Sequence, residues 1–407
     1  MPNRINRRKF IQSSTVAGIG LGLGGSSLFA ASALPAPSSP LPASVKNRLP
    51  RWRGFNLLDF FMPNPQSRRR GTTEDHLRWM ADWGFDFVRL PMAYPYYLDI
   101  DRAKPVTPED VRRIDPRRVD EIDRLVTLAH KHGLHVNLNL HRAPGYCVNA
   151  GFTEPFNLWR DQAALDAFCF HWGMWATRFR HESPARISFD LVNEPSMRED
   201  MNDQHSRRSS VPGDVYRRVA QAAATTIREA NPAHLVIADG NDTGTRVIPE
   251  LADLDIAQSC RGYHPATVSH YRAPWAFKDA DHMPEPRWPG DVEWHDTDAK
   301  TGQARVWTEK LGRPMLDDFY RPWIEIMKQG VGVHCGECGC WNKTPHAVFL
   351  AWFGDVLDIL TTNGIGYALW EFDGDFGVLN SGRADVAYED WHGQKLDREL
   401  LELLQKH

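Results

Sequence analysis

Two stretches of the sequence end in the same way: Arg186-Ile-Ser-Phe-Asp-Leu-Val-Asn-Glu-Pro195 and Val331-Gly-Val-His-Cys-Gly-Glu337. Each contains a short apolar run, which is typical of a buried strand, and each reaches a glutamate just before turn residues. In a closed parallel barrel, side chains at the carboxyl ends of the strands face the mouth. The sequence therefore predicts a barrel with a carboxylate pair, Glu194 and Glu337, across its mouth. Such a pair is what hydrolysis of a glycosidic bond requires.

Outward from these stretches, the chain alternates short apolar runs with amphipathic stretches, which is typical of repeated strand–helix units. We expect strands at Arg53–Leu57, Phe85–Leu90, His135–Leu140, Arg186–Glu194, Leu235–Ala238, Asp255–Cys260, Val331–Glu337 and Ile365–Trp370. We expect helices at Glu74–Trp83, Arg117–His132, Asp161–Arg180, Gly213–Ala230, Leu316–Gln329, His346–Asn363 and Gln394–Gln405, with a weak one near Thr245–Leu251. Eight strands in one series favour an α/β protein folded as a single (β/α)₈ barrel over an open sheet.

One segment breaks this alternation. Between the sixth and seventh strands, Tyr263–Pro314 is rich in Trp, Pro, His and Asp. We expect a long irregular loop there, because loops of this length in a compact domain are usually lids or binding walls.

Residues 1–33 predict a twin-arginine export signal. Arg7 and Arg8 precede a mildly apolar, glycine-rich stretch, and Ala31-Ser-Ala33 offers a cleavage site of small residues. That stretch is too short and too rich in glycine to cross a bilayer comfortably, so we expect no stable membrane insertion after the signal is removed. Residues 34–50 predict a Pro/Ser/Ala linker, and residues 51–407 the catalytic domain. We therefore expect the protein to be periplasmic or secreted.

The composition narrows the choice of partner. The chain has 48 Lys and Arg against 52 Asp and Glu, a near balance that gives no indication of a nucleic-acid partner or an anionic membrane. It also has 15 Trp, more than a core usually needs. Because the flat indole suits the apolar faces of sugar rings, this excess favours a carbohydrate ligand. We expect the protein to act as a monomer.

The sequence Cys335-Gly-Glu-Cys338-Gly-Cys340 has the look of a metal-binding knuckle, with His334 and His346 nearby. A second Cys or His pair at zinc-site spacing is not evident in the sequence. We therefore expect no metal and no organic cofactor, with a metal-dependent hydrolase as the alternative. A disulfide from Cys338 or Cys340 to another loop is compatible with export, but no pairing follows from the sequence.

Five motifs, in the order of the expected strands, resemble glycoside hydrolase family 5, the cellulase-like retaining β-glycosidases. They are Phe87-Val-Arg-Leu-Pro91, Leu140-His-Arg-Ala-Pro-Gly145, Val192-Asn-Glu-Pro195, Gly336-Glu337 and Ala368-Leu-Trp370. Each motif alone is weak, but their order over nearly the whole chain past residue 51 is specific. The resemblance implies a (β/α)₈ glycosidase that hydrolyses O-glycosyl bonds by double displacement.

By this resemblance Glu194 is the acid/base and Glu337 the nucleophile. A retaining enzyme needs its two carboxyls about 5–5.5 Å apart, so that one attacks the anomeric carbon while the other protonates the leaving oxygen. The acid needs a raised pKa, whereas the nucleophile has to stay ionised. Asn193, beside the acid, suits a hydrogen bond to the sugar 2-hydroxyl.

The resemblance gives three further residues a place in the site. Arg89 is expected below Glu337 as a charge-assisted donor, Trp370 as the floor of the sugar site before the cleaved bond, and His141 as a donor to ring hydroxyls there. Each also has a structural alternative: Arg89 as partner of a buried Asp, Trp370 as a core residue, and His141 as a satisfied buried imidazole.

One departure from the family concerns the end of the sixth strand, where the family usually shows His-x-Tyr. Here Tyr263 fits the tyrosine, but Arg261 stands in place of the histidine. Either Arg261 supplies the missing donor, or His264 or His270 replaces it. Catalysis is then slow or the substrate unusual, and a carbohydrate-binding protein with weak turnover is an alternative.

The sequence indicates the substrate less clearly than it indicates the reaction. Aromatic candidates for stacking on sugars are Trp275, Trp288, Trp294 and Trp307 in or beside the long loop, and Trp52, Tyr94, Tyr96 and Tyr97 on the opposite side. We expect a β-linked polysaccharide or oligosaccharide, first of all β-1,4-glucan cut internally. Mannan, xyloglucan, β-1,3-glucan and cleavage from one end stay open, because the motifs do not encode hydroxyl geometry.

Overall fold

The computed structural model describes residues 49–67, 71–200, 203, 205–297 and 304–407. The expected export signal (1–33) and nearly all of the linker (34–50) lie outside these residues. Of the helices in the described part of the chain, none combines the length and the apolar character needed to cross a bilayer.

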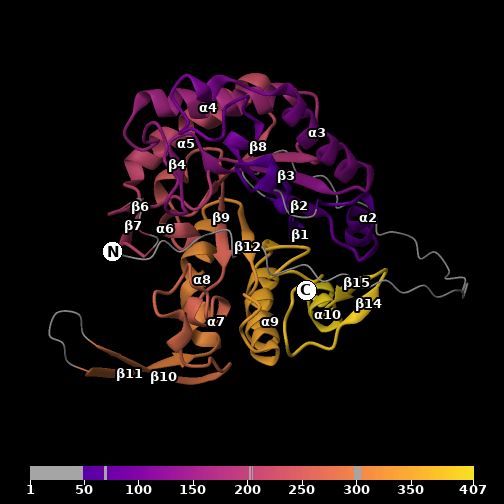
Figure 1. The fold of residues 1–407 in the computed structure, drawn as a ribbon, viewed down its shortest axis with the longest axis vertical. Coiled ribbons are helices and arrows are strands. Elements are labelled where there is room, and N and C mark those ends of the chain that lie inside the picture. The colour runs from indigo at the N-terminus through magenta and orange to yellow at the C-terminus, as the bar shows by residue number, and fades with distance from the viewer. Residues whose placement is uncertain (1–48, 68–70, 201–202, 204, 298–303) are drawn as a thin grey trace, which may run out of the picture. The chain divides into compact units, whose positions relative to one another are not determined.

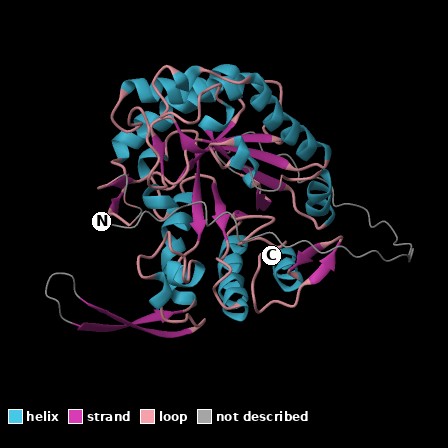
Figure 2. Ribbon diagram, in the orientation of Figure 1, coloured by secondary structure: helices cyan, strands magenta, loops and turns pink. Residues whose placement is uncertain are grey.

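Eight parallel strands close into a barrel (Figures 1 and 2). In barrel order they are β1 (Arg53–Asn56), β2 (Phe87–Ala93), β3 (His135–Ala143), β5 (Ile187–Asp190), β8 (Leu235–Asp239), β9 (Ala257–Gly262), β12 (Val333–Cys338) and β13 (Gly366–Leu369). Each strand pairs with the next, and β1 also pairs with β13, which closes the sheet. The (β/α)₈ barrel predicted from the sequence is confirmed.

Helices follow most of these strands and pack against one another around the barrel. They are α2 (Glu74–Asp82), α3 (Pro116–Lys131), α4 (Gln162–Arg178), α5 (Gly213–Ala230), α8 (Arg313–Met327), α9 (His346–Thr362) and α10 (Arg398–Lys406), with the short α6 (Asn241–Gly244) after β8. Helix α3 shows why they form where they do. Asp115 caps its first turn by accepting from the Arg117 amide, and Pro116 supplies the first helical position.

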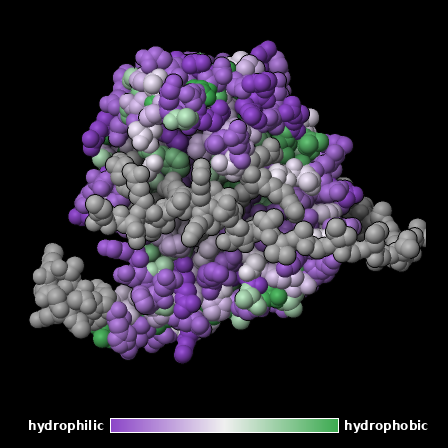
Figure 3. All heavy atoms as spheres, viewed as in Figure 1, coloured by the Kyte–Doolittle hydropathy of each residue, from purple (hydrophilic) through white to green (hydrophobic). Residues whose placement is uncertain are grey.

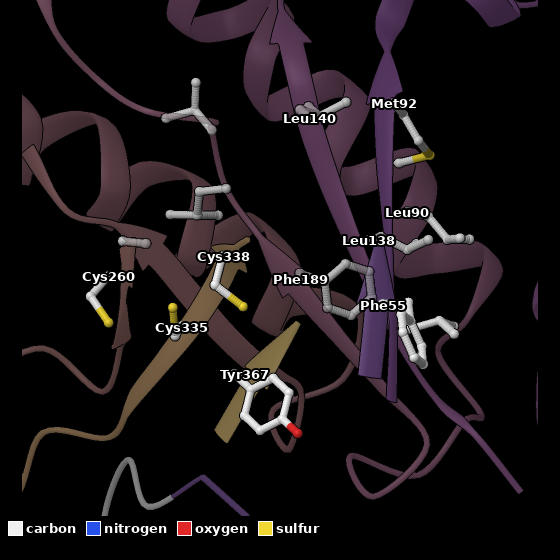
Figure 4. Packing of buried hydrophobic residues seen from close by; sticks show 14 of the residues in the cluster. Phe55, Leu90, Met92, Leu138, Leu140, Phe189, Cys260, Cys335, Cys338 and Tyr367 are labelled. Carbon is white, nitrogen blue, oxygen red and sulfur yellow. The ribbon is translucent and has the colours of Figure 1, made fainter. Parts of the chain in front are cut away.

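The pleat of the barrel strands separates an apolar outer face from a polar inner one. Leu90, Leu138 and Phe189 lie side by side on β2, β3 and β5, are fully buried, and appear together in Figure 4. Their neighbours one residue earlier, Arg89 and Asn137 among them, point to the other face because successive strand residues alternate. Polar residues therefore line the barrel interior below its mouth.

The prediction of an irregular loop over Tyr263–Pro314 is wrong. This segment contains the short helix α7 (Ala266–Ser269) and an antiparallel hairpin of β10 (Gly290–Thr297) and β11 (Ala304–Leu311), which extends away from the neighbouring helices in Figure 1. Trp294 and Trp307 lie opposite each other on it and stack at 5.5 Å. The alternation of Val292 and Trp294 with charged residues is a strand signal, but it covers only two apolar positions in a segment otherwise rich in Pro, Asp and His. The coloured part of the face seen in Figure 3 is mostly hydrophilic.

The last helix also begins later than expected. Gln394–Leu396, where the first turn of this helix is expected, is β15, which pairs with β14 (Glu389–Trp391). The two strands are joined by His392 and Gly393, both at positive φ (+53° and +81°), as a tight two-residue hairpin requires. Asp397 then caps α10 by accepting from the Leu400 amide.

Several aromatic residues expected to stack on sugars are buried. The expectation is wrong for the group on the opposite side from the long loop, Trp52, Tyr94, Tyr96 and Tyr97, which all lie in the hydrophobic interior. Trp52, for example, stacks on His135 at 3.8 Å. Trp288 is buried as well and donates to Asp355 of α9, so it fixes the base of the hairpin. Whether such a side chain is buried depends on packing partners from the whole barrel, and the local sequence does not reveal those partners.

Candidate active site

The two glutamates lie at the carboxyl ends of barrel strands, as their positions in the sequence predict. Glu194 follows β5, and Glu337 lies near the end of β12. The pairing of β12 with β9 shifts register between Cys335 and Glu337, so the strand bulges just before the glutamate. A bulge re-aims the next side chain, and Gly336 allows it, because an added Cβ would lie 2.6 Å from Ser259 Oγ.

Glu194 has a left-handed backbone, with φ of +49°. Its amide donates to Asp239 Oδ2 at 2.9 Å, and its carbonyl accepts from the Tyr146 hydroxyl at 2.6 Å. A non-glycine residue in this conformation costs free energy and persists only where neighbours hold it. Asp239 and Tyr146 are those neighbours, and together they fix the direction in which the carboxyl leaves the backbone.

Glu337 is held by three donors from two other strands and the loop after β9. Its Oε1 accepts from Arg89 Nη1 at 2.6 Å and from Arg261 Nη2 at 3.3 Å. Its Oε2 accepts only from the Tyr263 hydroxyl, at 3.3 Å, among the described contacts. Two guanidinium groups therefore restrain one oxygen of this carboxylate. The other oxygen keeps a single long neutral contact, which leaves it available to a substrate.

Asn193 is oriented by the same two guanidinium groups. Its Oδ1 accepts from Arg89 Nη2 at 3.0 Å and from Arg261 Nη2 at 2.9 Å, which identifies the oxygen of the amide. Its Nδ2 then donates to His141 Nε2 at 3.2 Å. His141 is therefore neutral with its proton on Nδ1, in agreement with burial and the two arginines, which hold its pKa well below the usual range.

The Nδ1 of His141 lies 4.0 Å from Glu337 Oε1 and is buried without a hydrogen-bond partner in the described structure. An unpartnered buried donor beside a carboxylate is costly unless something else accepts from it. The same imidazole stacks on Trp370 at 5.4 Å, and Phe61 packs edge-on against that indole at 5.7 Å. Trp370 is partly exposed and thus presents a face beside the carboxylates.

Two further carboxyls, Asp190 and Asp239, complete the buried cluster. Asp190 accepts from Arg89 Nε at 2.8 Å, and Asp239 accepts from Arg261. Sequence reasoning missed both. The signal available was a lone aspartate at the end of each apolar strand, since a charge there needs a partner. With Glu194 and Glu337, four carboxyls surround two guanidinium groups.

The excess of carboxyls over guanidinium groups shifts the pKa values of two of these carboxyls. Loss of water, repulsion by Glu337 and a smaller repulsion by Asp239 raise the pKa of Glu194 from 4.5 to about 7, against the attraction of Arg261. Burial and Asp239 also raise the pKa of Asp190 to about 7. A carboxyl that keeps its proton near neutrality can act as a general acid, whereas one tied to guanidinium groups suits a nucleophile.

The family model for cellulase, glycosyl hydrolase family 5, matches residues 44–375. This chain belongs to glycosyl hydrolase family 5. The family predicted from the sequence is confirmed, and so is the activity class: the protein is a glycosidase that hydrolyses O-glycosyl bonds.

Relatives agree with this assignment. Endoglucanase C of Acetivibrio thermocellus is 25% identical over 328 residues, which cover 78% of this chain and 89% of that enzyme. Cellodextrinase A of Ruminococcus flavefaciens is 24% identical over 318 residues, 77% of this chain and 83% of that enzyme. A crystal structure described as a glycoside hydrolase superposes with a TM-score of 0.73 at 33% identity, covering 88% of this chain and 99% of the other.

The remaining candidate residues, His264, His270 and Trp275, lie in the loop after β9 of this family 5 enzyme. His270 packs edge-on against Tyr263 at 5.0 Å, and burial lowers its pKa to about 4. Trp275 packs edge-on against Trp341 at 4.6 Å, in an aromatic cluster that includes Tyr263 and Trp370. His264 instead stacks on Phe319 of α8 at 4.5 Å, so it is not brought into the carboxylate cluster.

Neither the cysteines nor other ligand types gather into a metal site in the described residues, where no group of three or more His, Cys, Asp or Glu side chains is arranged to hold an ion. All six cysteines of the chain lie in this part, and each is a free thiol. Cys335 and Cys338 are buried below the mouth of the barrel, where Cys338 Sγ lies 3.3 Å from the Ala368 carbonyl.

Proposed function

We propose that this family 5 enzyme cleaves β-1,4-linked glucan by double displacement, with Glu337 as nucleophile and Glu194 as acid/base. The observation that carries the proposal is the contrast between the two carboxyls. Glu337 accepts from Arg89 and Arg261, whereas desolvation leaves Glu194 with a pKa of about 7. Both contact the single guanidinium of Arg261, in keeping with the short spacing of a retaining pair, about 5–5.5 Å.

In the first step Glu337 Oε2 attacks the anomeric carbon, since Oε1 is held by the arginines. Glu194 donates its proton to the departing glycosidic oxygen, and a covalent glycosyl-enzyme forms. The Nδ2 of Asn193 and the unpartnered Nδ1 of His141 are the donors available to sugar hydroxyls beside Glu337. Trp370 stacks below the sugar before the cleaved bond.

In the second step Glu194, now ionised, removes a proton from a water molecule. The resulting hydroxide attacks the same carbon, breaks the ester to Glu337, and releases the sugar with its original anomeric configuration. The Tyr263 hydroxyl donates to the Oε2 that Glu337 regains.

The choice of β-1,4-glucan is supported by the relatives, one named an endoglucanase and another a cellodextrinase. The assay that tests it is hydrolysis of carboxymethyl-cellulose, barley glucan, glucomannan and laminarin by wild type, Glu337→Gln and Glu402→Gln. Glu402 is exposed on α10 and serves as the matched control. We expect carboxymethyl-cellulose and barley glucan to be cut by wild type and the control, and by Glu337→Gln at least about 10³-fold more slowly.

Two results contradict the proposal. If the enzyme prefers laminarin or glucomannan, the proposed β-1,4-glucan substrate is wrong. If proton NMR shows that the first product has inverted anomeric configuration, the double-displacement mechanism is wrong. A polymer that loses viscosity faster than it gains reducing ends indicates internal cutting.

We propose further that the twin-arginine segment exports the enzyme to the periplasm or beyond. Replacing Arg7 and Arg8 by lysine is expected to leave the protein in the cytoplasm, since the arginine pair is the feature that the export machinery reads. Fractionation of cells that express each version measures this, and unchanged export contradicts it.

A further inference from the structure

Arg261 lies near the end of β9, and its guanidinium reaches both glutamates. Nε donates to Glu194 Oε1 at 2.9 Å, and Nη2 donates to Glu337 Oε1 at 3.3 Å. The same Nη2 contacts the oxygen of Asn193 at 2.9 Å. Because Nε–H and one Nη–H of a guanidinium are parallel, one rigid fork sets where these acceptors lie relative to each other.

The place of this arginine is built by residues on β8, α6 and β9. Asp239 accepts from both Nη atoms of Arg261, and Ser259 Oγ lies 3.1 Å from Nη1. Gly244 borders the aliphatic stem, and a Cβ added there would lie 2.5 Å from Arg261 Cγ. The arginine is 1% exposed, so its charge is held by these neighbours rather than by water.

A histidine has a different reach. Neutral imidazole offers one donor and one acceptor, whereas guanidinium offers five donors and is always charged. A neutral histidine at this place would offer one donor and bring no charge that needs a partner. Arg261 brings a buried positive charge, and the carboxylate of Asp239 pairs with it.

We propose that Arg261, aimed by Asp239, is a positioning residue that fixes both catalytic glutamates and sets the alkaline end of the pH range in which Glu194 works as the acid. The proposal rests on the roles given above to Glu194 and Glu337. It adds that the arginine and the aspartate act as one unit, with opposite effects on the acid/base.

The opposite effects follow from charge. Arg261 lowers the pKa of Glu194, and Asp239 raises it. The alkaline limb of kcat/KM reports the acid that has to be protonated, here Glu194. Removing the arginine therefore moves the alkaline limb to higher pH, and removing the aspartate moves it to lower pH. Neutralising both returns the profile toward that of wild type.

The test is the kcat/KM profile of Arg261→Gln, Asp239→Asn and the double variant on 4-nitrophenyl β-cellobioside and on a soluble glucan that wild type cleaves. We expect Arg261→Gln to shift the alkaline limb upward by about one pH unit or more, as loss of a charge within about 4–6 Å does. Asp239→Asn is expected to shift the alkaline limb down, and the double variant to lie between. If the alkaline limb stays in place while the maximum of kcat/KM falls, the two residues have a merely structural role and the proposal is overturned.

A second pair of variants leaves every charged group intact. Gly244→Ala and Gly364→Ala impose the same backbone strain, since their φ values are +76° and +74°, but only the first pushes on Arg261. An added Cβ at Gly364 has no atom within 4 Å. We expect Gly244→Ala to displace the alkaline limb and Gly364→Ala to leave it where wild type has it. Equal behaviour of the two contradicts the proposal.

Failure of the proposed function is distinguishable from failure of this inference. If wild type cleaves no glycoside, the function is wrong, and urea unfolding of the same variants still tests the pair. The double variant is expected to unfold at a higher urea concentration than Arg261→Gln alone, because it no longer buries an Asp239 carboxylate whose remaining ion pair is the longer one to Arg89, at 3.6 Å. If the stability losses of the two single variants simply add in the double variant, Arg261 and Asp239 do not act as one unit, and the inference is wrong.

Discussion

Replacing Glu194 by glutamine is expected to stabilise the folded enzyme at alkaline pH. The carboxyl has little contact with water and faces Glu337, which together raise its pKa from 4.5 to about 7. Below pH 4.5 it is protonated in both the folded and the unfolded chain. Above about pH 7 it is ionised in both, and only the folded state then holds a poorly solvated charge. Stability present below the unfolded pKa is therefore lost as the pH rises through the folded pKa.

The structure gives the size of this loss. The shift from 4.5 to about 7 corresponds to about 3 kcal/mol, at about 1.4 kcal/mol per unit. The side chain is 17% exposed, so screening by water removes little of it. Glutamine has the same shape and can still accept from Arg261 Nε, but it has no charge to desolvate. The difference in unfolding free energy, variant minus wild type, is thus expected to rise between pH 4.5 and 7 and then to level off.

Urea unfolding followed by tryptophan fluorescence measures this difference at about one-unit steps from pH 4.5 to 8.5. Glu402→Gln, an exposed glutamate of α10, is the matched control and should show no comparable rise. A Glu194→Gln difference that stays constant over the whole range refutes the reasoning, because it means that folding leaves the proton affinity of Glu194 unchanged. The measurement needs no substrate, so it tests the electrostatics of the site independently of its activity.

Two further predictions concern catalysis. Wild-type kcat/KM is expected to fall about tenfold per pH unit above about pH 7, since only protonated Glu194 can assist the leaving oxygen; a profile flat to pH 9 contradicts this assignment. Trp370→Ala is expected to raise KM about two- to tenfold, the worth of one aromatic stacking contact, because the sugar loses the face that His141 holds in place. Trp288→Phe, which changes a tryptophan at the base of the hairpin, is its control, and an equal rise in both variants contradicts a sugar-stacking role.

The elements that carry the two glutamates could be read from the sequence because local signals agree there. Apolar runs of strand length end in turn residues at Glu194 and Glu337, and barrel topology brings strand ends together whatever the details of packing. Asp190 and Asp239 illustrate the limit. Each is a single charge in an apolar run, and its partner arginine lies on a different strand, so the pairing exists only once the barrel has closed.

The aromatic residues illustrate the same limit. A tryptophan in a polar segment has the same local sequence pattern whether its side chain packs in the core or binds a sugar. Trp288 is buried against α9, whereas Trp307 is 40% exposed on the hairpin, and only the surrounding helices distinguish them. The choice among Arg261, His264 and His270 was open for a similar reason, since three residues of one short segment can point in different directions. Arg261 points inward because β9 pleats it toward Asp239.

The contact of Arg261 with both glutamates bears on how the two divide their roles. A permanent positive charge beside both of them by itself favours ionisation of both, and a glycosidase with two ionised carboxylates has no acid. Asp239 offsets that charge, and the left-handed backbone of Glu194 directs its carboxyl to the Nε edge alone. Glu337 receives the second arginine, Arg89, as well. Unequal sharing of two guanidinium groups among four carboxyls thus leaves one glutamate able to hold a proton and the other able to attack.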